Sequence, residues 1–196
     1  MSKVLYQGHA SLRLTLNDGR VIYIDPYAGD GYDKEADFIL ITHGHSDHNQ
    51  ISKVTQKSNC IVISNEQALV KCEYKTFAYN GFKIEVVAAY NGRHPKDKCV
   101  GYILGFDGLT MYISGDTSKI DEMQALTNRN IDYAFFCADG IFNMGLEESA
   151  ECAKIVNAKK NIPYHLAPMR LFSSGRAKKW TAPNKLIIEA GEEIEL

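Results

Sequence analysis

The chain has 196 residues, of which 45% are hydrophobic and 23% charged, and its formal net charge at pH 7 is −2. This size and composition predict a single α/β domain, residues 1–196, with a substantial core. Lysine and arginine are scattered rather than massed, which argues against a general nucleic-acid or anionic-membrane surface. We therefore expect neither a nucleic acid nor a membrane as partner.

The N-terminus and the cysteines indicate a compartment. The first residues contain too short an apolar run for a signal peptide, and no stretch approaches the roughly 20 apolar residues of a membrane helix. The five cysteines are dispersed and lack C-x-x-C spacing, which is typical of reduced thiols. We expect a cytoplasmic protein with ordinary and mostly buried thiols at Cys60, Cys72, Cys99, Cys137 and Cys152.

The N-terminal segment predicts three strands. Residues 3–6 form a short strand that leads into Gly8-His9-Ala10. Apolar residues alternate over 12–16, a turn follows at Asn17-Asp18-Gly19, and residues 21–24 return, which is the pattern of a β-hairpin. The hairpin delivers Asp25 at a strand end.

The next strand precedes a dense group of metal-binding residue types. Residues 38–41 are all apolar, as in a strand covered on both faces, and T-H-G-H-S-D-H follows at 42–48. In extended chain His43 and His45 point the same way, so both can bind one cation, and a turn then frees Asp47 and His48 for a second. A histidine-rich surface loop is the alternative. It is disfavoured because three of the six histidines fall within six residues beside an apolar strand.

The middle of the chain repeats the hairpin pattern. Residues 64–67 form a capping box that opens a helix to about residue 73, and residues 83–90 form a strand running out to His94. Residues 101–106, a turn at 107–108 and residues 110–113 form a second hairpin, which delivers Asp116 as the first delivers Asp25. This weak internal repeat indicates two related halves. A turn-capping role is the alternative for each aspartate.

The remaining elements alternate between helix and strand. A helix capped by Ser118 is expected through about Thr127, with apolar residues at 120, 123, 125 and 126. Residues 131–137 form a strand, 146–157 an amphipathic helix, 162–164 a strand ending at His165, 173–180 a helix, and 185–189 a closing strand. The segment 139–145 forms either a pocket wall or a simple turn.

The H-x-H-x-D-H motif behind a buried strand resembles the signature of the metallo-β-lactamase superfamily. The resemblance implies an α/β fold, a four-layered αβ/βα sandwich of two pseudo-symmetric halves. The segment A-Y-N-G-R-H-P-K at 89–96 is similar to one found in the L-ascorbate-6-phosphate lactonase-like branch. The resemblance covers nearly the whole chain and says little about substrate.

The resemblance also implies a ligand set. His43, His45 and His94 would bind one divalent ion, Asp47, His48 and His165 the other, and Asp116 would bridge them. Asp47 and Asp25 would orient groups or accept protons, and His9 would lie near the site. Nitrogen and oxygen ligands suit zinc, which we expect, while manganese and iron fit the same cage.

These residues predict an enzyme, a dinuclear metal-dependent hydrolase that uses a metal-bridging hydroxide on a small ester- or lactone-type metabolite, with or without a phosphate. A phosphodiesterase or small nuclease is the second enzyme hypothesis, and a non-hydrolytic metal-binding protein is the third. The absence of a cysteine ligand argues against β-lactam hydrolysis. The resemblance allows a homo-oligomer. Candidate anchors for a substrate phosphate are Arg93, Lys96, Arg170 and Arg176.

Overall fold

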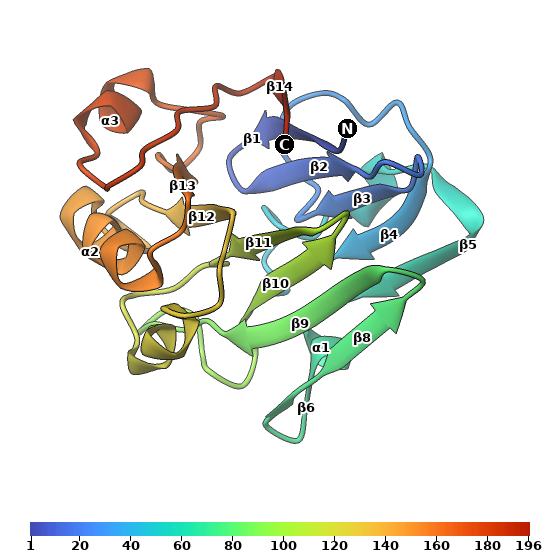
Figure 1. Ribbon diagram of the computed structural model, residues 1–196, viewed down its shortest axis with the longest axis horizontal. Helices are drawn as coiled ribbons and strands as arrows, with labels where there is room; N and C mark the ends of the chain where they lie inside the picture. Colours follow the sequence, from blue (N-terminus) through green and yellow to red (C-terminus); the bar gives the residue numbers. More distant parts are fainter.

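The computed structural model describes residues 1–196 as two six-stranded sheets packed face to face, with helices at one side (Figure 1). The first sheet has the order β14-β1-β2-β3-β4-β5. Its strands are β1 (Lys3–Gly8), β2 (Ser11–Thr15), β3 (Val21–Ile24), β4 (Ala36–Leu40), β5 (Gln56–Ile63) and β14 (Glu192–Glu195).

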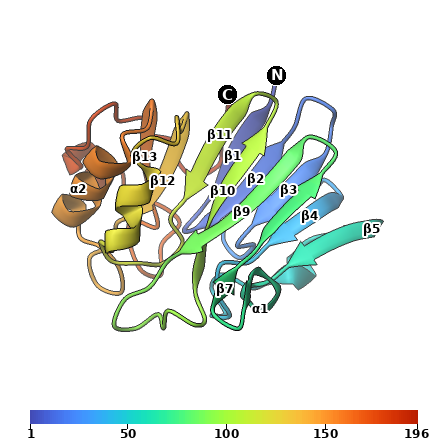
Figure 2. The same ribbon diagram turned by 60° about the horizontal axis from the view of Figure 1, so that its bottom comes forward.

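The second sheet has the order β13-β12-β11-β10-β9-β8. Figure 2 shows it lying over the first sheet as a separate layer. Its strands are β8 (Thr76–Tyr79), β9 (Phe82–Ala88), β10 (Val100–Phe106), β11 (Leu109–Ile113), β12 (Tyr133–Cys137) and β13 (Lys160–Tyr164).

The two sheets share one internal plan, as the repeated hairpin predicts. In the first, β1, β2 and β3 pair antiparallel, and β4 and β5 then add in parallel. In the second, β9, β10 and β11 pair antiparallel, and β12 and β13 add in parallel. The metallo-β-lactamase fold with two related halves is therefore confirmed.

The main core lies between the sheets. Phe38 and Leu40 of β4 belong to it, whereas Ile39 and Ile41 belong to a smaller cluster on the opposite face. Strand β4 is thus covered on both sides, as its unbroken apolar run predicts. The outer cover of the first sheet consists of loop residues and the short helix η1 (Ile51–Lys53).

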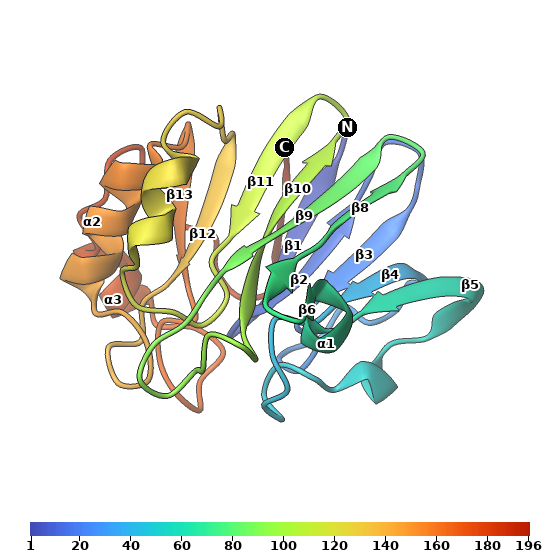
Figure 3. The ribbon, with the colours of Figure 1, turned by 90° about the horizontal axis from the view of Figure 1, so that it is seen from below.

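The helices gather on the second sheet. Helix α2 (Leu146–Val156) packs on β12, and α3 (Ser174–Lys179) lies beside it (Figure 3). Asn157 ends α2 in a left-handed conformation, with φ of 54°. None of the helices is long and apolar enough to cross a membrane.

The helix expected from residue 64 to about 73 is wrong in its length. Ser64 and Gln67 do form the capping box, but α1 ends at Ala68 (Asn65–Ala68). The chain then forms the small hairpin of β6 (Leu69–Val70) and β7 (Glu73–Tyr74). Lys71 and Cys72 between these strands both have positive φ, which a continuing helix does not allow.

The helix expected from Ser118 is also wrong. Residues Asp121–Leu126 form the 3₁₀ helix η2, which has no side-chain cap. The buried apolar residues Ile120, Met123 and Leu126 recur every three positions, which matches three residues per turn. Ser118 instead donates its backbone N–H to Tyr90 O at 3.0 Å.

The closing strand is misplaced in the sequence prediction. Residues 185–189 form no named strand, and Lys185 makes only an isolated bridge to Asn161. The chain closes instead with β14, which pairs with β1. Its sequence, E-E-I-E, is mostly charged because it is an edge strand. Strands β5 and β8 were not predicted.

Candidate metal centre

The site lies at the edge where the strands of both sheets end. Strands β1, β3 and β4 run in one direction, and β9, β11, β12 and β13 do the same in their sheet. Two backbone hydrogen bonds join these edges, from Val100 N to Thr42 O at 3.0 Å and from His165 N to His9 O at 2.7 Å. Residues following these strands therefore meet, as ligands do at the carboxyl ends of α/β strands.

All six histidines of the chain converge at this edge. The ring centroids of His43 lie 4.6 Å from His45, 4.1 Å from His48 and 4.9 Å from His94. The ring of His9 lies 3.8 Å from that of His165 and 5.6 Å from that of His48. Such convergence has no use in ordinary core packing.

The donor atoms form three groups, each within 4.8 Å, which together contain every residue predicted as a ligand. One group is His43, His45 and His94, and another is His9, Asp47, His48 and His165. The third joins His43, His48 and Asp116. Asp116 Oδ2 lies 3.6, 3.4 and 3.5 Å from the Nε2 atoms of His48, His94 and His165.

Several buried atoms here have no hydrogen-bond partner: His48 Nε2, Asp116 Oδ1 and both ring nitrogens of His165. A buried polar atom without a partner costs about 1–3 kcal/mol. Imidazole nitrogens and a carboxylate oxygen aimed at one another are the donors that divalent transition metals bind. The residues therefore fit a metal site.

Polar neighbours hold the donors in place. Asp25 accepts hydrogen bonds from Thr42 N (2.8 Å) and Thr42 Oγ1 (2.7 Å), and its Oδ2 lies 2.9 Å from His48 Nδ1. Asn91 Oδ1 lies 3.0 Å from His94 Nδ1. Asp25 therefore orients His48, and Asn91 orients His94, which leaves the Nε2 atoms facing the cluster.

A second group of neighbours surrounds Asp116. Asn143 Nδ2 donates to Asp116 Oδ2 at 2.8 Å and to Asp139 Oδ2 at 2.9 Å. Asp139 Oδ1 in turn accepts the backbone N–H groups of Ile141 and Phe142, each at 2.7 Å. Sequence reasoning missed Thr42, Asn91 and Asn143. The one feature of the sequence that could have indicated these three residues is that each lies within a few residues of a predicted donor or strand end.

Three site residues adopt left-handed backbone conformations: His9, Asp25 and His165, with φ of 53°, 46° and 46°. Each of the three directly follows the last residue of a strand. Non-glycine residues at such φ cost energy and cluster at functional sites. The turn aims each side chain back across the strand ends.

The electrostatics of the cluster favour a neutral His43 and an ionised Asp116, whereas they favour the charged form of His48, which must lose its proton to bind a cation. Burial, followed by the charge of His48, lowers the pKa of His43 to about 2. Burial opposes the charge on His48, yet the carboxylates of Asp116 and Asp25 outweigh it and raise its pKa to about 9. Burial likewise opposes ionisation of Asp116, but the surrounding histidines hold its pKa well below the usual range. A neutral His43 and an ionised Asp116 are ready to bind a cation.

Three cavities open beside the cluster. One of about 340 Å³ is lined by His45, Asp47, Arg93, His94, Asp116, Phe142 and His165. A larger one of about 730 Å³ begins at His43 and His45 and extends past α1. A third, of about 360 Å³, is bounded by His9, Lys53 and Arg170. Phe142 makes the segment 139–145 a pocket wall.

The four candidate anchors have different surroundings. Lys96 pairs with Glu122, and Arg176 donates from Nη2 to Ala138 O at 2.7 Å, so both are engaged in structural contacts. Arg93 lies over the ring of Phe142, 5.1 Å from its centroid, and Arg170 lines the third cavity. Only Arg93 borders the 340 Å³ cavity.

Comparison with known proteins identifies the family. Residues 3–165 match the beta-lactamase superfamily domain. A UPF0173 metal-dependent hydrolase of Geobacillus sp. (strain WCH70) is 30% identical over 192 residues, covering 83% of this chain and 84% of that protein. Another from Thermococcus onnurineus (strain NA1) is 30% identical over 191 residues, covering 84% of each.

Solved structures agree. A crystal structure of a candidate metal-dependent hydrolase from Parabacteroides distasonis ATCC 8503 has a TM-score of 0.80 and 33% identity, covering 96% of this chain and 93% of that one. Igni18, a metallo hydrolase from Ignicoccus hospitalis, has a TM-score of 0.76 at 19% identity, covering 98% and 97%, and shows the shared fold alone. With its buried His/Asp cluster, the chain belongs to the metallo-β-lactamase superfamily and, within it, to the UPF0173 family of metal-dependent hydrolases.

Proposed function

We propose that the chain hydrolyses a small ester or lactone carrying one negatively charged group, such as a phosphate, at a site for two divalent ions. His43, His45 and His94 would hold one ion, and Asp47, His48 and His165 the other, with Asp116 between them. The unpartnered buried atoms of His48, Asp116 and His165 are the observation that carries the assignment.

Zinc is the proposed metal. The donor set contains imidazole nitrogens and carboxylate oxygens and no thiolate, which suits zinc and also manganese or iron. A fold relative from Thermotoga maritima, 23% identical, is described as a candidate Zn-dependent hydrolase. When bound, such ions supply a nucleophile by lowering the pKa of water, and they polarise the bond under attack.

The chain's own residues would orient groups and move protons. Asp47 lies at the cavity wall with its side chain 41% exposed, and the His9 ring, whose Nε2 lies 3.2 Å from Asp47 Oδ2, holds the pKa of this carboxyl below its ordinary value. An ionised, accessible carboxylate can accept a proton from an attacking water. Asp25 is fully buried and reaches only His48 and Thr42, so its role is to position His48.

The cavity walls support the substrate class. A volume of about 340 Å³ suits a metabolite rather than a polymer. Arg93 offers one guanidinium that lies over the ring of Phe142 and has no carboxylate within ion-pair distance, which fits a single anionic group. The A-Y-N-G-R-H-P-K segment contains this arginine, and its resemblance to the lactonase-like branch supports the same class.

The test compares metal-loaded protein with its Asp47→Ala variant on lactones, esters, a chromogenic phosphodiester and single-stranded RNA. We expect turnover of a lactone or ester that is lost in the variant. RNA or phosphodiester cleavage lost in the variant, without lactone or ester turnover, would instead support the nuclease or phosphodiesterase. Turnover of nothing, with metal bound, would favour the non-hydrolytic protein.

Arg93 is tested separately with matched substrates, one carrying a phosphate and one lacking it. Arg93→Gln should raise KM about tenfold for the phosphorylated substrate, equivalent to about 1.4 kcal/mol, because one exposed charged contact is lost. The KM of the neutral substrate should stay the same. Equal changes for both substrates would remove the anchoring role.

A further inference from the structure

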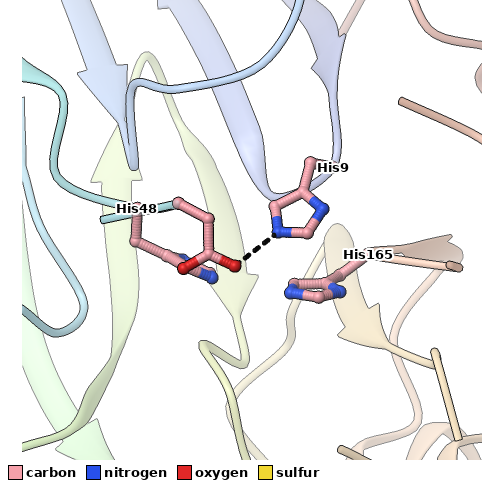
Figure 4. Close-up of side chains that lie close together, drawn as sticks. His9, His48 and His165 are labelled. Carbon is pink, nitrogen blue, oxygen red and sulfur yellow. Dashed lines mark hydrogen bonds and ion pairs between the residues drawn. The ribbon is translucent and has the colours of Figure 1, made fainter. Parts of the chain in front are cut away.

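We infer that His9 is a metal ligand, the sixth histidine of the centre, which would make two sets of three imidazoles. The inference extends the proposed metal site and rests on it. The sets are His43, His45 and His94 on one side and His9, His48 and His165 on the other. Figure 4 shows the side chains of His9, His48 and His165 lying close together.

The geometry of His9 matches a ligand. Its Nε2 lies 3.2 Å from Asp47 Oδ2, and its donor atom lies within 4.8 Å of those of Asp47, His48 and His165. Two ligands bound tetrahedrally at about 2.1 Å from one ion are about 3.4 Å apart. His9 is also 3% exposed, so its ring is committed to this interior position.

Hydrogen bonds to the backbone of His9 hold this residue in place independently of any contact that its ring makes. His9 N donates to Leu171 O at 2.6 Å, and His9 O accepts from His165 N at 2.7 Å and from Tyr6 Oη at 2.8 Å. These bonds hold the residue at φ of 53°, a conformation that few non-glycine residues adopt. A histidine in a strained conformation, held by three hydrogen bonds to its backbone and placed beside two other imidazoles, is preorganised as a ligand.

The competing role is a hydrogen bond. If Nε2 of His9 carries a proton, it donates to Asp47 and holds that carboxylate for the metal without touching the metal itself. The two roles differ in what replaces histidine successfully. A glutamine amide can donate a hydrogen bond to Asp47, but it is a poor ligand for zinc or cobalt.

The experiment measures metal affinity and the visible absorption of the Co²⁺-loaded full-length protein. Wild type, His9→Gln and His9→Ala are titrated with Zn²⁺ and Co²⁺ under the same buffer conditions. If His9 is a ligand, both variants should bind one of the two ions more than about 100-fold more weakly, since even second-sphere losses cost 10–100-fold. The cobalt bands of that ion should change alike in both variants.

The opposite result is equally clear. Wild-type affinity and an unchanged cobalt spectrum in His9→Gln would assign His9 to the hydrogen-bonding role and overturn the inference. Failure of the wild type to bind any metal would instead overturn the proposed function. Two ions bound to the wild type, together with an unaltered His9→Gln, would overturn only this inference.

Two controls separate ligation from folding. Lys53→Ala alters the same 360 Å³ cavity without removing a donor, and it should bind both ions as the wild type does. Melting temperatures are compared in excess chelator, where metal binding contributes nothing. His9→Asn serves as the second variant because asparagine tolerates positive φ, so it keeps the turn and should still lose one ion.

Discussion

Asp25 contacts a histidine of the cluster and has a left-handed backbone conformation. Both its oxygens are occupied, by Thr42 and by Nδ1 of His48, and no exposed surface remains. Because His48 Nδ1 is fixed in this way, Nε2 is the nitrogen left for a cation. Asp116 differs, since its Oδ1 has no partner at all.

The two aspartates should therefore respond differently to substitution. Asp116→Ala should remove bound metal together with activity. Asp25→Asn keeps the shape and tolerates the positive φ, so it should retain most of its metal and lose about 10–100-fold in activity. Metal content is measured on protein purified without chelator and supplemented with zinc. Two tightly held ions in Asp116→Ala would contradict the position between the metals that we propose for Asp116.

The thiols should be dispensable. All five cysteines are unpaired, and none belongs to a donor group. Cys99 is the one that borders the 730 Å³ cavity, and burial raises its pKa to about 12, so it stays a neutral thiol. Cys99→Ala should bind the same number of ions as the wild type, as judged by metal analysis after dialysis. Loss of an ion would identify a sulfur ligand.

The sequence predicts the metal-binding donors far better than the residues that form hydrogen bonds to those donors. His43, His45, Asp47 and His48 fall within six residues of one loop that follows an apolar strand, so their grouping follows from local geometry. Asn91 and Asn143 reach the cluster only because separate loops fold back over the same strand ends. Their positions depend on tertiary packing, for which a single sequence carries no periodic signal.

Among the elements, the turn before Asp116 is tightly constrained by a close backbone contact. Gly115 has φ of 61°, and a Cβ placed on it would lie 2.4 Å from Val100 O. This contact is with backbone, so no side chain can move aside. The close approach brings the end of β11 against the start of β10 and sets the position of Asp116.

Gly115→Ala should accordingly destabilise the protein and weaken metal binding. The matched control is Gly108→Ala, with φ of 79° and nothing within 4 Å of the added Cβ. The control should cost about 1–2 kcal/mol for the left-handed backbone alone. Gly115→Ala should cost several kcal/mol more, because the backbone overlap adds to the same strain. Urea denaturation of both variants gives the difference, and equal losses would exclude the steric effect.

The wrongly predicted elements share a cause. The segment that forms η2 and its N-cap has buried apolar residues every three positions, and the sequence predicts an α-helix there only because Ala125 is counted with them. The predicted continuation of the helix capped by Ser64 fails at Lys71 and Cys72, which both have positive φ. Glycine is the usual residue at positive φ, so neither residue type predicts this turn. Strand β14 exists through its pairing with β1 and not through its own charged sequence.

At the scale of the whole molecule, a side-chain hydrogen bond joins the two sheets near the metal centre, in addition to the two backbone hydrogen bonds described above. Tyr102 on β10 donates its hydroxyl to Ile41 O, just beyond β4, at 2.7 Å in the buried interior. Tyr112 on the neighbouring strand is equally buried, but its hydroxyl has no partner. The two tyrosines form a natural comparison.

Tyr102→Phe should destabilise the protein by about 1–2 kcal/mol, because the carbonyl of Ile41 loses its buried donor. Tyr112→Phe should be neutral or stabilising, because it removes a hydroxyl that already lacks a partner. Unfolding in urea measures both changes on metal-free protein. A larger loss in Tyr112→Phe than in Tyr102→Phe would contradict this account of the sheet contact.

The hydrogen bond between His165 and His9 spans nearly the whole length of the chain. During synthesis, residues 9, 43, 45, 47, 48, 94 and 116 all leave the ribosome before residue 165, so a growing chain carries an incomplete group of donors for much of its translation. Strand β13 must add to β12 before His165 can reach its neighbours. The donor group that contains His165 is therefore the last of the three to be completed, and a chain that has not yet formed β13 can assemble only the two groups that lack His165.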